Sequence, residues 1–313
     1  LNILGITQLQ KKSYKEAADT FEQALARSPG SVGIIFNLAR VQVAENEISQ
    51  AIDNLQKALR LSPEHTPSAT LLAILEARKG NTSAALELLG KHQAINKDNR
   101  LLYVLEGDIH LSKSGYEDAV NAYRKAWDLA PDQKVAKNLY AALKGANMGN
   151  AMDYLSEWLE THPDDNSIRV IRAQAYQEQG DSEKAIEDYE HILQAAPENP
   201  LILNNLAWLY FEKKDSRALG LAEKAHEISP ELATIADTLG WLLVESGENA
   251  RGLEILKKAV EQEPDIPEIH YHLAVAYAKA GDSDEAKKVM NQVIKSDDRL
   301  RNLPNVKKIL QNN

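Results

Sequence analysis

The sequence predicts an all-helical solenoid of about nine helix-turn-helix repeats, closed by a C-terminal capping helix. Three observations lead to this prediction: a helix-forming composition, a recurring proline and two columns of small residues. The chain has 313 residues, which is longer than one compact core usually grows, so an elongated repeat architecture or several domains are expected. Only 11 prolines and 15 glycines interrupt a sequence rich in Ala, Leu, Glu and Lys, all good helix formers.

A proline that follows a helical segment recurs along the chain. The steps between successive prolines are 34, 68, 32, 34, 33 and 34 residues, at Pro29, Pro63, Pro131, Pro163, Pro197, Pro230 and Pro264. The step of 68 is two units of 34, with Lys97 at the intermediate place. Because proline cannot continue a helix, each marks the end of a repeat, and the chain divides into nine units.

Small residues recur at fixed positions relative to this proline. If the closing proline is repeat position 32, position 8 holds Gly5, Ala39, Ala73, Gly107, Ala141, Ala173, Ala207, Gly240 and Ala274. Position 20 holds Ala17, Ala51, Ala85, Ala119, Ala151, Ala185, Ala218, Gly252 and Ala286, if the short units lose residues in the turn between their helices. Two antiparallel helices approach closely where a small side chain faces the partner, so these columns predict a tightly packed helical hairpin. At position 15, Gly80, Gly180, Gly247 and Gly281 are expected to end the first helix in the left-handed conformation.

The repeat array is expected to cover residues 1–300, with an irregular fifth repeat at about 132–163. That repeat is two residues short, and bulky Trp158 stands at position 27, where alanine is usual. Gly145 and Gly149 are expected to loosen its turn. We expect a bend within one domain here, and the alternative is a hinge between two arrays.

The two ends of the sequence differ. Residue 1 corresponds to position 4, inside a first helix, so we expect further repeats upstream in a longer protein. Residues 301–313 are expected to form the capping helix. It would start at Pro304, and its apolar face consists of Leu303, Val306, Ile309 and Leu310.

Composition and motifs exclude several classes of function. The net charge of -10 disfavours nucleic acid as a partner, and no apolar run is long enough to span a membrane. The absence of cysteine excludes disulfides and thiolate metal sites. No phosphate-loop, dinucleotide, hydrolase or zincin motif is present, so we expect no enzymatic activity and no cofactor. His270 and His272 are two residues apart, and a helix points such side chains in different directions, so we expect no metal site there.

These repeats resemble the tetratricopeptide repeat family, whose unit is a helical hairpin of about 34 residues with small residues at positions 8 and 20. The resemblance implies a right-handed superhelix and a scaffold that holds protein or peptide partners on its concave face. In that geometry the concave face is lined by positions 2, 5, 9, 12 and 13 of the first helices. The same family serves many functions, so the partner must be argued from the residues on this face.

Units seven to nine carry an unusual set of residues at those positions. Hydrogen-bonding groups and aromatic rings line up across three first helices, at Asn204, Trp208, Phe211, Asp237, Trp241 and Tyr271. Amphipathic aromatics are frequent binding anchors, so these six residues are the candidate partner-binding groove. Direct binding of carbohydrate through the same aromatics is the alternative function, and packing of the tryptophans as wedges between helices is the structural alternative. The absence of cations at positions 5 and 9 of these units argues against a clamp for a C-terminal carboxylate.

The segments NNLAWLY, DTLGWLLVESG and IHYHLAVAYAKAGD resemble the C-terminal part of the repeat lipoproteins of bacterial exosortase (PEP-CTERM) systems. The resemblance implies a periplasmic, lipid-anchored protein associated with exopolysaccharide production and protein sorting. The anchoring cysteine would lie in an N-terminal region outside this sequence. No catalytic residue is implied.

Overall fold

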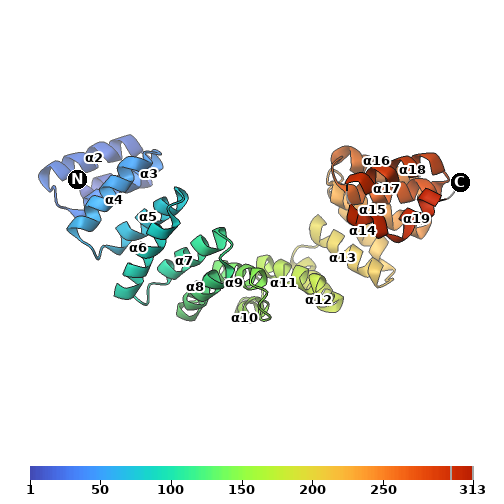
Figure 1. Cartoon of the computed structure of the whole chain (residues 1–313), viewed down its shortest axis with the longest axis horizontal. Coiled ribbons are helices and arrows are strands. Elements are labelled where there is room, and N and C mark those ends of the chain that lie inside the picture. Colours follow the sequence, from blue (N-terminus) through green and yellow to red (C-terminus); the bar gives the residue numbers. More distant parts are fainter. Residues whose placement is uncertain (297, 312–313) are drawn as a thin grey trace. The chain divides into compact units, whose positions relative to one another are not determined.

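The computed structural model describes residues 1–296 and 298–311, and every regular element in them is a helix (Figure 1). The first helices of nine hairpins are α1 (Asn2–Gln10), α3 (Val32–Ala44), α5 (Thr66–Arg78), α7 (Arg100–Ser112), α9 (Gln133–Gly145), α11 (Asn166–Glu178), α13 (Pro200–Glu212), α15 (Ala233–Ser246) and α17 (Pro267–Ala280). Their second helices are α2 (Tyr14–Arg27), α4 (Ile48–Leu61), α6 (Thr82–Ile95), α8 (Tyr116–Leu129), α10 (Asp153–Thr161), α12 (Ser182–Ala195), α14 (Arg217–Ile228), α16 (Asn249–Gln262) and α18 (Ser283–Ser296). A short 3-10 helix, η1 (Asp298–Asn302), and α19 (Pro304–Gln311) follow. The predicted all-helical solenoid of helix-turn-helix repeats is confirmed.

The chain forms two compact units. Unit 1 is Leu1–Pro163 and contains α1 to α10, whereas unit 2 is Asp164–Asn313 and contains α11 to α19. Each first helix packs against its own second helix, and first helices of successive hairpins also meet, as α5, α7 and α9 do in unit 1 and α13, α15 and α17 do in unit 2. We call the side of each unit that the first helices form its first-helix face.

The small residues at positions 8 and 20 bring the two helices of a hairpin together. Sixteen of the eighteen are buried, and both exceptions belong to the fifth hairpin. In unit 1, a Cβ on Gly5 would lie 2.6 Å from the ring of Phe21, so the large residue at position 24 fills the space at position 8. Between α15 and α16, a Cβ on Gly252 would lie 2.7 Å from the carbonyl oxygen of Gly240. The backbones of these two helices are thus close enough to exclude any larger side chain.

The fifth hairpin departs from the predicted register. Ala141 is exposed and Ala151 lies in the turn before α10, although both were expected at the helix interface. The reason is that the Asp132 carboxylate caps α9, accepting a hydrogen bond from the backbone N–H of Val135 at 2.8 Å. This cap starts α9 one residue earlier than the regular repeat would, so Tyr140 takes position 8. One residue is therefore missing before α9, and α10 lacks the first turn of a regular second helix.

A residue in the left-handed conformation ends the first helix of every hairpin. Four of these residues are the predicted glycines, Gly80, Gly180, Gly247 and Gly281, with φ between 78° and 96°. The other five are not glycine, with φ between 55° and 64°: Lys12, Asn46, Ser114, Asn147 and Lys214. Asn147 falls at position 15 only when Tyr140 is position 8, which supports the shifted register of the fifth hairpin.

The C-terminal helix α19 packs against α17 and α18. Val306 and Ile309 are buried there, and Leu303 and Leu310 pack against the same cluster. The side-chain amide of Asn305 donates a hydrogen bond to the Tyr271 hydroxyl at 3.3 Å. α19 therefore covers the end of the ninth hairpin.

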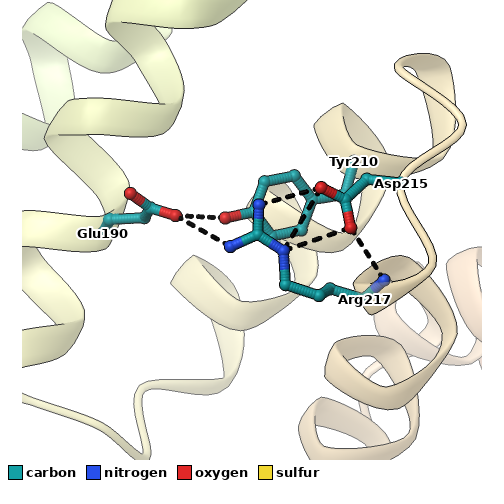
Figure 2. A network of polar contacts seen from close by, with 4 residues as sticks. All are labelled: Glu190, Tyr210, Asp215 and Arg217. Carbon is teal, nitrogen blue, oxygen red and sulfur yellow. Dashed lines mark hydrogen bonds and ion pairs between the residues drawn. The ribbon is translucent and has the colours of Figure 1, made fainter.

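A polar network joins α12, α13 and α14 in unit 2 (Figure 2). The Tyr210 hydroxyl donates to the Glu190 carboxylate, and the Arg217 guanidinium lies 4.0 Å from the centre of the Tyr210 ring. Arg217 also donates to Glu190 at 3.3 Å and to Asp215 at 2.8 Å. Burial and the hydrogen bond to Glu190 raise the pKa of Tyr210 to about 12, and hydrogen bonds from Arg217 lower the pKa of Asp215 to about 2. At neutral pH the Tyr210 hydroxyl therefore stays protonated and donates a hydrogen bond, and the Asp215 carboxylate stays ionised and accepts from Arg217.

Candidate functional site

The first-helix face of unit 2 holds a pocket of about 390 Å³, which we call the unit 2 pocket. It is lined from α11, α13, α15 and α17, and the side chains that matter chemically are Asn204, Trp208, Thr234, Asp237, Glu268 and His272. Three of the six residues predicted from the sequence, Asn204, Trp208 and Asp237, therefore line one pocket. Positions 5 and 9 bring them together because α13 and α15 lie side by side.

The polar part of the unit 2 pocket combines two carboxylates, Asp237 and Glu268, with amides, hydroxyls and an imidazole. The Asp237 carboxylate lies 2.7 Å from Nδ1 of His272, and both side chains are about 15% exposed. The Oδ1 atom of Asn204 is buried and has no hydrogen-bond partner among the described residues. Because a buried acceptor without a partner costs free energy, a donor from a bound molecule would be stabilising at this atom.

Trp208 forms the aromatic wall of the unit 2 pocket and is partly exposed. Its indole Nε1–H donates to the Glu212 carboxylate one turn later, at 3.0 Å. Its ring centre lies 6.5 Å from that of His272 and 5.9 Å from that of Phe211. These contacts fix the orientation of the indole and leave Phe211 beside it rather than in the pocket.

Trp241 and Tyr271, the other two aromatic residues predicted on α15 and α17, do not line the unit 2 pocket. The ring centre of Trp241 lies 4.4 Å from that of His272, with the ring planes tilted by 30°, and the indole packs against two hydrophobic clusters, which is the kind of packing that the wedge alternative describes. Tyr271 is only 7% exposed, because α19 lies over it and Asn305 bonds its hydroxyl. Tyr271 therefore does not present the open aromatic face that its position suggested.

Sequence reasoning missed other residues of the unit 2 pocket. Thr234 and Glu268 stand at position 2 of α15 and α17, which is one of the positions expected to line the groove. They were not selected from the sequence because neither is aromatic. His272 was considered from the sequence only as a metal ligand, and its contact with Asp237 joins two repeats across 35 residues of sequence. Residue spacing within one helix carries no signal for such a contact.

A second pocket was also missed. It lies on the first-helix face of unit 1, has a volume of about 560 Å³ and is lined by Phe36, Arg40, Thr70, Leu71, Ile74 and Leu101, among others. We call it the unit 1 pocket. Its lining is mostly aliphatic and aromatic carbon, with the exposed Arg40 at its side.

Neither histidine of the suspected pair is arranged with a partner ligand for a metal. The Nε2 atom of His270 lies 2.8 Å from the Pro264 carbonyl oxygen, and His272 pairs with Asp237. Within residues 1–296 and 298–311, no group of three or more His, Cys, Asp or Glu side chains is placed to hold a metal ion. In the same part of the chain, no helix combines the length and the apolar character needed to cross a bilayer.

Two family models match the chain, and both are described as tetratricopeptide repeat. One matches residues 8–53 and 243–311, and the other matches residues 36–99 and 172–230. Together the matched segments cover more than half of the chain and include hairpins of both units.

Individual relatives are distant. BBSome complex member BBS4 of Bos taurus is 22% identical over 287 residues, which are 90% of this chain and 55% of that protein. A TPR repeat-containing protein of Methanocaldococcus jannaschii is 21% identical over 314 residues, covering 92% of this chain and 54% of the relative. The chain thus spans about half the length of the curated relatives it matches.

The solved structures that resemble this chain also have low sequence identity to it. MamA from Desulfovibrio magneticus is 20% identical with a TM-score of 0.46, over 54% of this chain and 97% of that chain. Yeast Tom70 is 15% identical with a TM-score of 0.40, over 99% of this chain and 86% of that chain.

Proposed function

Because the chain belongs to the tetratricopeptide repeat family, whose members are generally protein-interaction scaffolds, we propose that it holds a peptide or protein partner on its first-helix face, without catalysing a reaction. The unit 2 pocket is the proposed binding site. The observation that carries the proposal is the meeting, in one pocket, of the Trp208 indole with the unpaired Asn204 oxygen.

Each part of this pocket has a role that suits a peptide. The partly exposed indole of Trp208 offers apolar area whose orientation is already fixed, so little conformational entropy is lost on binding. Asn204 and Asp237 offer acceptors to backbone or side-chain N–H groups of an extended segment. A protein partner is also favoured by the name of one relative, which is a member of a complex.

The setting we propose is the bacterial envelope. The resemblance of NNLAWLY and DTLGWLLVESG to the exosortase-linked repeat lipoproteins supports a periplasmic scaffold in exopolysaccharide production and protein sorting, anchored through a lipid outside this sequence. The test is the genomic neighbourhood: adjacent exosortase and polysaccharide-export genes support this setting, and their absence contradicts it.

Carbohydrate binding is the second candidate, because a partly exposed indole flanked by amide and carboxylate acceptors also suits a sugar ring. A tryptophan-fluorescence titration with exopolysaccharide fragments, beside a peptide pull-down, separates the two candidates. Saturable quenching by the fragments alone would favour sugar over peptide.

The proposed site is tested by Trp208→Ala. Truncation should weaken partner binding by about 2 kcal/mol, roughly thirty-fold, with helix content unchanged, since this is the usual scale of an interface hot spot. Trp241→Ala should instead lower stability, because its ring is wedged between helices.

Trp127→Ala is the control. This tryptophan is 5% exposed in α8, where it packs against Tyr154 and donates to Glu157. Its loss should reduce stability without a selective effect on binding. Equal partner binding by the Trp208 and Trp127 variants would contradict the unit 2 pocket as the binding site.

A further inference from the structure

We propose that the unit 2 pocket binds an arginine side chain of the partner segment, between the Trp208 indole and the Asp237 carboxylate. This inference rests on the proposed function and names the chemistry that the pocket selects. It follows from the charge of the lining, from the acceptors that Asn204 and Asp237 offer and from the aromatic wall.

The charge of the pocket favours a cation. Asp237 and Glu268 contribute two carboxylates, and the described lining residues include neither lysine nor arginine. His272 is the one basic side chain in that lining, and it is already paired with Asp237. The described lining thus has two carboxylates and a single basic side chain, whose contact is with Asp237.

The hydrogen-bonding groups point the same way. Asn204 places an unpaired buried oxygen in the lining, and Asp237 adds carboxylate oxygens from the neighbouring helix. A guanidinium carries five N–H donors and no acceptor, and it holds them in a fixed planar fork. Acceptors on α13 and α15 therefore suit a guanidinium better than an ammonium, whose charge sits at one point.

The aromatic wall completes the site. A guanidinium stacks on an aromatic face while its edge donates to carboxylates. The same unit already contains such an arrangement: Arg217 lies 4.0 Å from the centre of the Tyr210 ring and donates to both Asp215 and Glu190 (Figure 2). In the unit 2 pocket, Trp208 corresponds to Tyr210, and Asp237 corresponds to the acceptor carboxylates. The arginine itself would come from the partner.

The unit 1 pocket provides an internal contrast. At position 9, α3 of the unit 1 pocket has the cation Arg40 where α13 of the unit 2 pocket has Trp208. At position 2, α7 has Leu101 where α17 has Glu268. Thr70 replaces Asp237 at position 5. An arginine probe should therefore bind in unit 2 and not in unit 1.

The test uses the whole chain and three tripeptides, which carry arginine, citrulline or lysine at the central position. Acetyl-Gly-Arg-Gly-amide is titrated against the ¹⁵N-labelled chain, and the four indole N–H signals are followed by NMR, with assignment from Trp→Phe variants. Acetyl-Gly-citrulline-Gly-amide has the same shape without the charge. We expect the arginine peptide to shift the Trp208 signal and the citrulline peptide to bind at least about tenfold more weakly, the scale of a charged hydrogen bond. The lysine peptide should fall between them.

Two variants with the same change of charge complete the design. Asp237→Asn keeps a polar partner for His272 and should weaken the arginine peptide at least about tenfold. Asp53→Asn removes an exposed carboxylate from α4 in unit 1 and should leave binding unchanged. Thermal unfolding of both variants by circular dichroism verifies that they fold.

The outcomes separate this inference from the proposed function. Equal binding of the arginine and citrulline peptides, or full binding by Asp237→Asn, overturns the arginine site even if Trp208→Ala still abolishes partner binding. Conversely, selective binding of the arginine peptide at Trp208, with partner binding unaffected by Trp208→Ala, supports the arginine site and overturns the proposed function.

Discussion

In unit 1 the pocket on the first-helix face presents Phe36 at repeat position 5 and Arg40 at position 9 of α3, whereas in unit 2 α13 presents Asn204 and Trp208 at these positions. At repeat position 2, α7 likewise contributes Leu101 to the unit 1 pocket, and α17 contributes Glu268 to the unit 2 pocket. The same backbone positions thus build both pockets, and the side chains give one an aliphatic lining beside a cation and the other acceptors beside an indole. Repeat geometry determines where a ligand can bind, and individual residues determine which ligand it is.

The largest expected effect tests whether hairpin packing places these pockets. Gly252→Ala puts a Cβ 2.7 Å from the carbonyl oxygen of Gly240, and relieving this contact requires a shift of one of the two helix backbones. We expect a loss of about 1–3 kcal/mol in the free energy of unfolding, the usual range for overpacking. Weaker binding at the unit 2 pocket should accompany it, because α15 carries Asp237 and Thr234.

Gly220→Ala is the matched control. Gly220 lies exposed in α14, and a Cβ there meets nothing within 4 Å. The same substitution should stabilise the chain by roughly 0.5–1 kcal/mol through the higher helix propensity of alanine. Urea unfolding measures both variants, and destabilisation of similar size in the two would mean that the close approach of α15 and α16 does not matter.

A smaller effect concerns the dependence of stability on pH, which should differ between the two units. His65 lies edge-on to Phe36 of the unit 1 pocket, with ring centres 5.5 Å apart, and Nδ1 of His92 lies 3.4 Å from the hydroxyl of Thr66. Burial lowers the pKa of His65, and burial followed by the charge of His65 lowers that of His92. The unfolded chain therefore binds these protons more readily than the folded chain, with an ordinary pKa of about 6.5.

It follows that stability around the unit 1 pocket is fully present above about pH 6.5 and falls as the pH drops below that value toward the folded pKa values. Unit 2 contains one histidine whose pKa is lowered in this way, His226, so its pH dependence should be shallower. Hydrogen exchange of α5 and α6 at pH 7.5 and 5.5, corrected for intrinsic rates, should show the loss, and His92→Gln should reduce it. Equal pH dependence in His92→Gln and the unsubstituted chain would contradict this assignment.

The smallest effect tests whether equivalent hairpins behave alike. Lys214 in unit 2 and Asn46 in unit 1 both have positive φ at position 15. Lys214→Gly should stabilise by about 1 kcal/mol, because a lysine side chain is strained there, and Asn46→Gly should gain less, because asparagine tolerates this conformation. Thermal unfolding compares the two, and a larger gain at Asn46 would be inconsistent with this explanation.

The sequence was sufficient to predict the hairpins, because helix packing needs small residues at fixed places and the chain repeats them. It failed at Ala141 and Ala151, because periodicity shows that two residues are missing but not where. The local signal was Asp132, a good N-cap that starts α9 early.

For the site, repeat position alone was enough to select Asn204, Trp208 and Asp237, which line one pocket, whereas the burial of Tyr271 depends on how α19 packs. The unit 1 pocket gives no distinct signal in the sequence, because residues such as Leu101 and Ile74 are ordinary in these repeats.

The most direct test of the central claim, that a partner is held in the unit 2 pocket, is site-specific photo-crosslinking. A benzophenone amino acid replaces Thr234 in the unit 2 pocket, Thr70 in the unit 1 pocket, or the exposed Glu227 on second helix α14. After irradiation with the partner captured by the unsubstituted chain, mass spectrometry locates the adduct. We expect a crosslink from position 234 that Trp208→Ala abolishes, and none from position 227. A crosslink from position 227 or 70 without one from position 234 would contradict the claim.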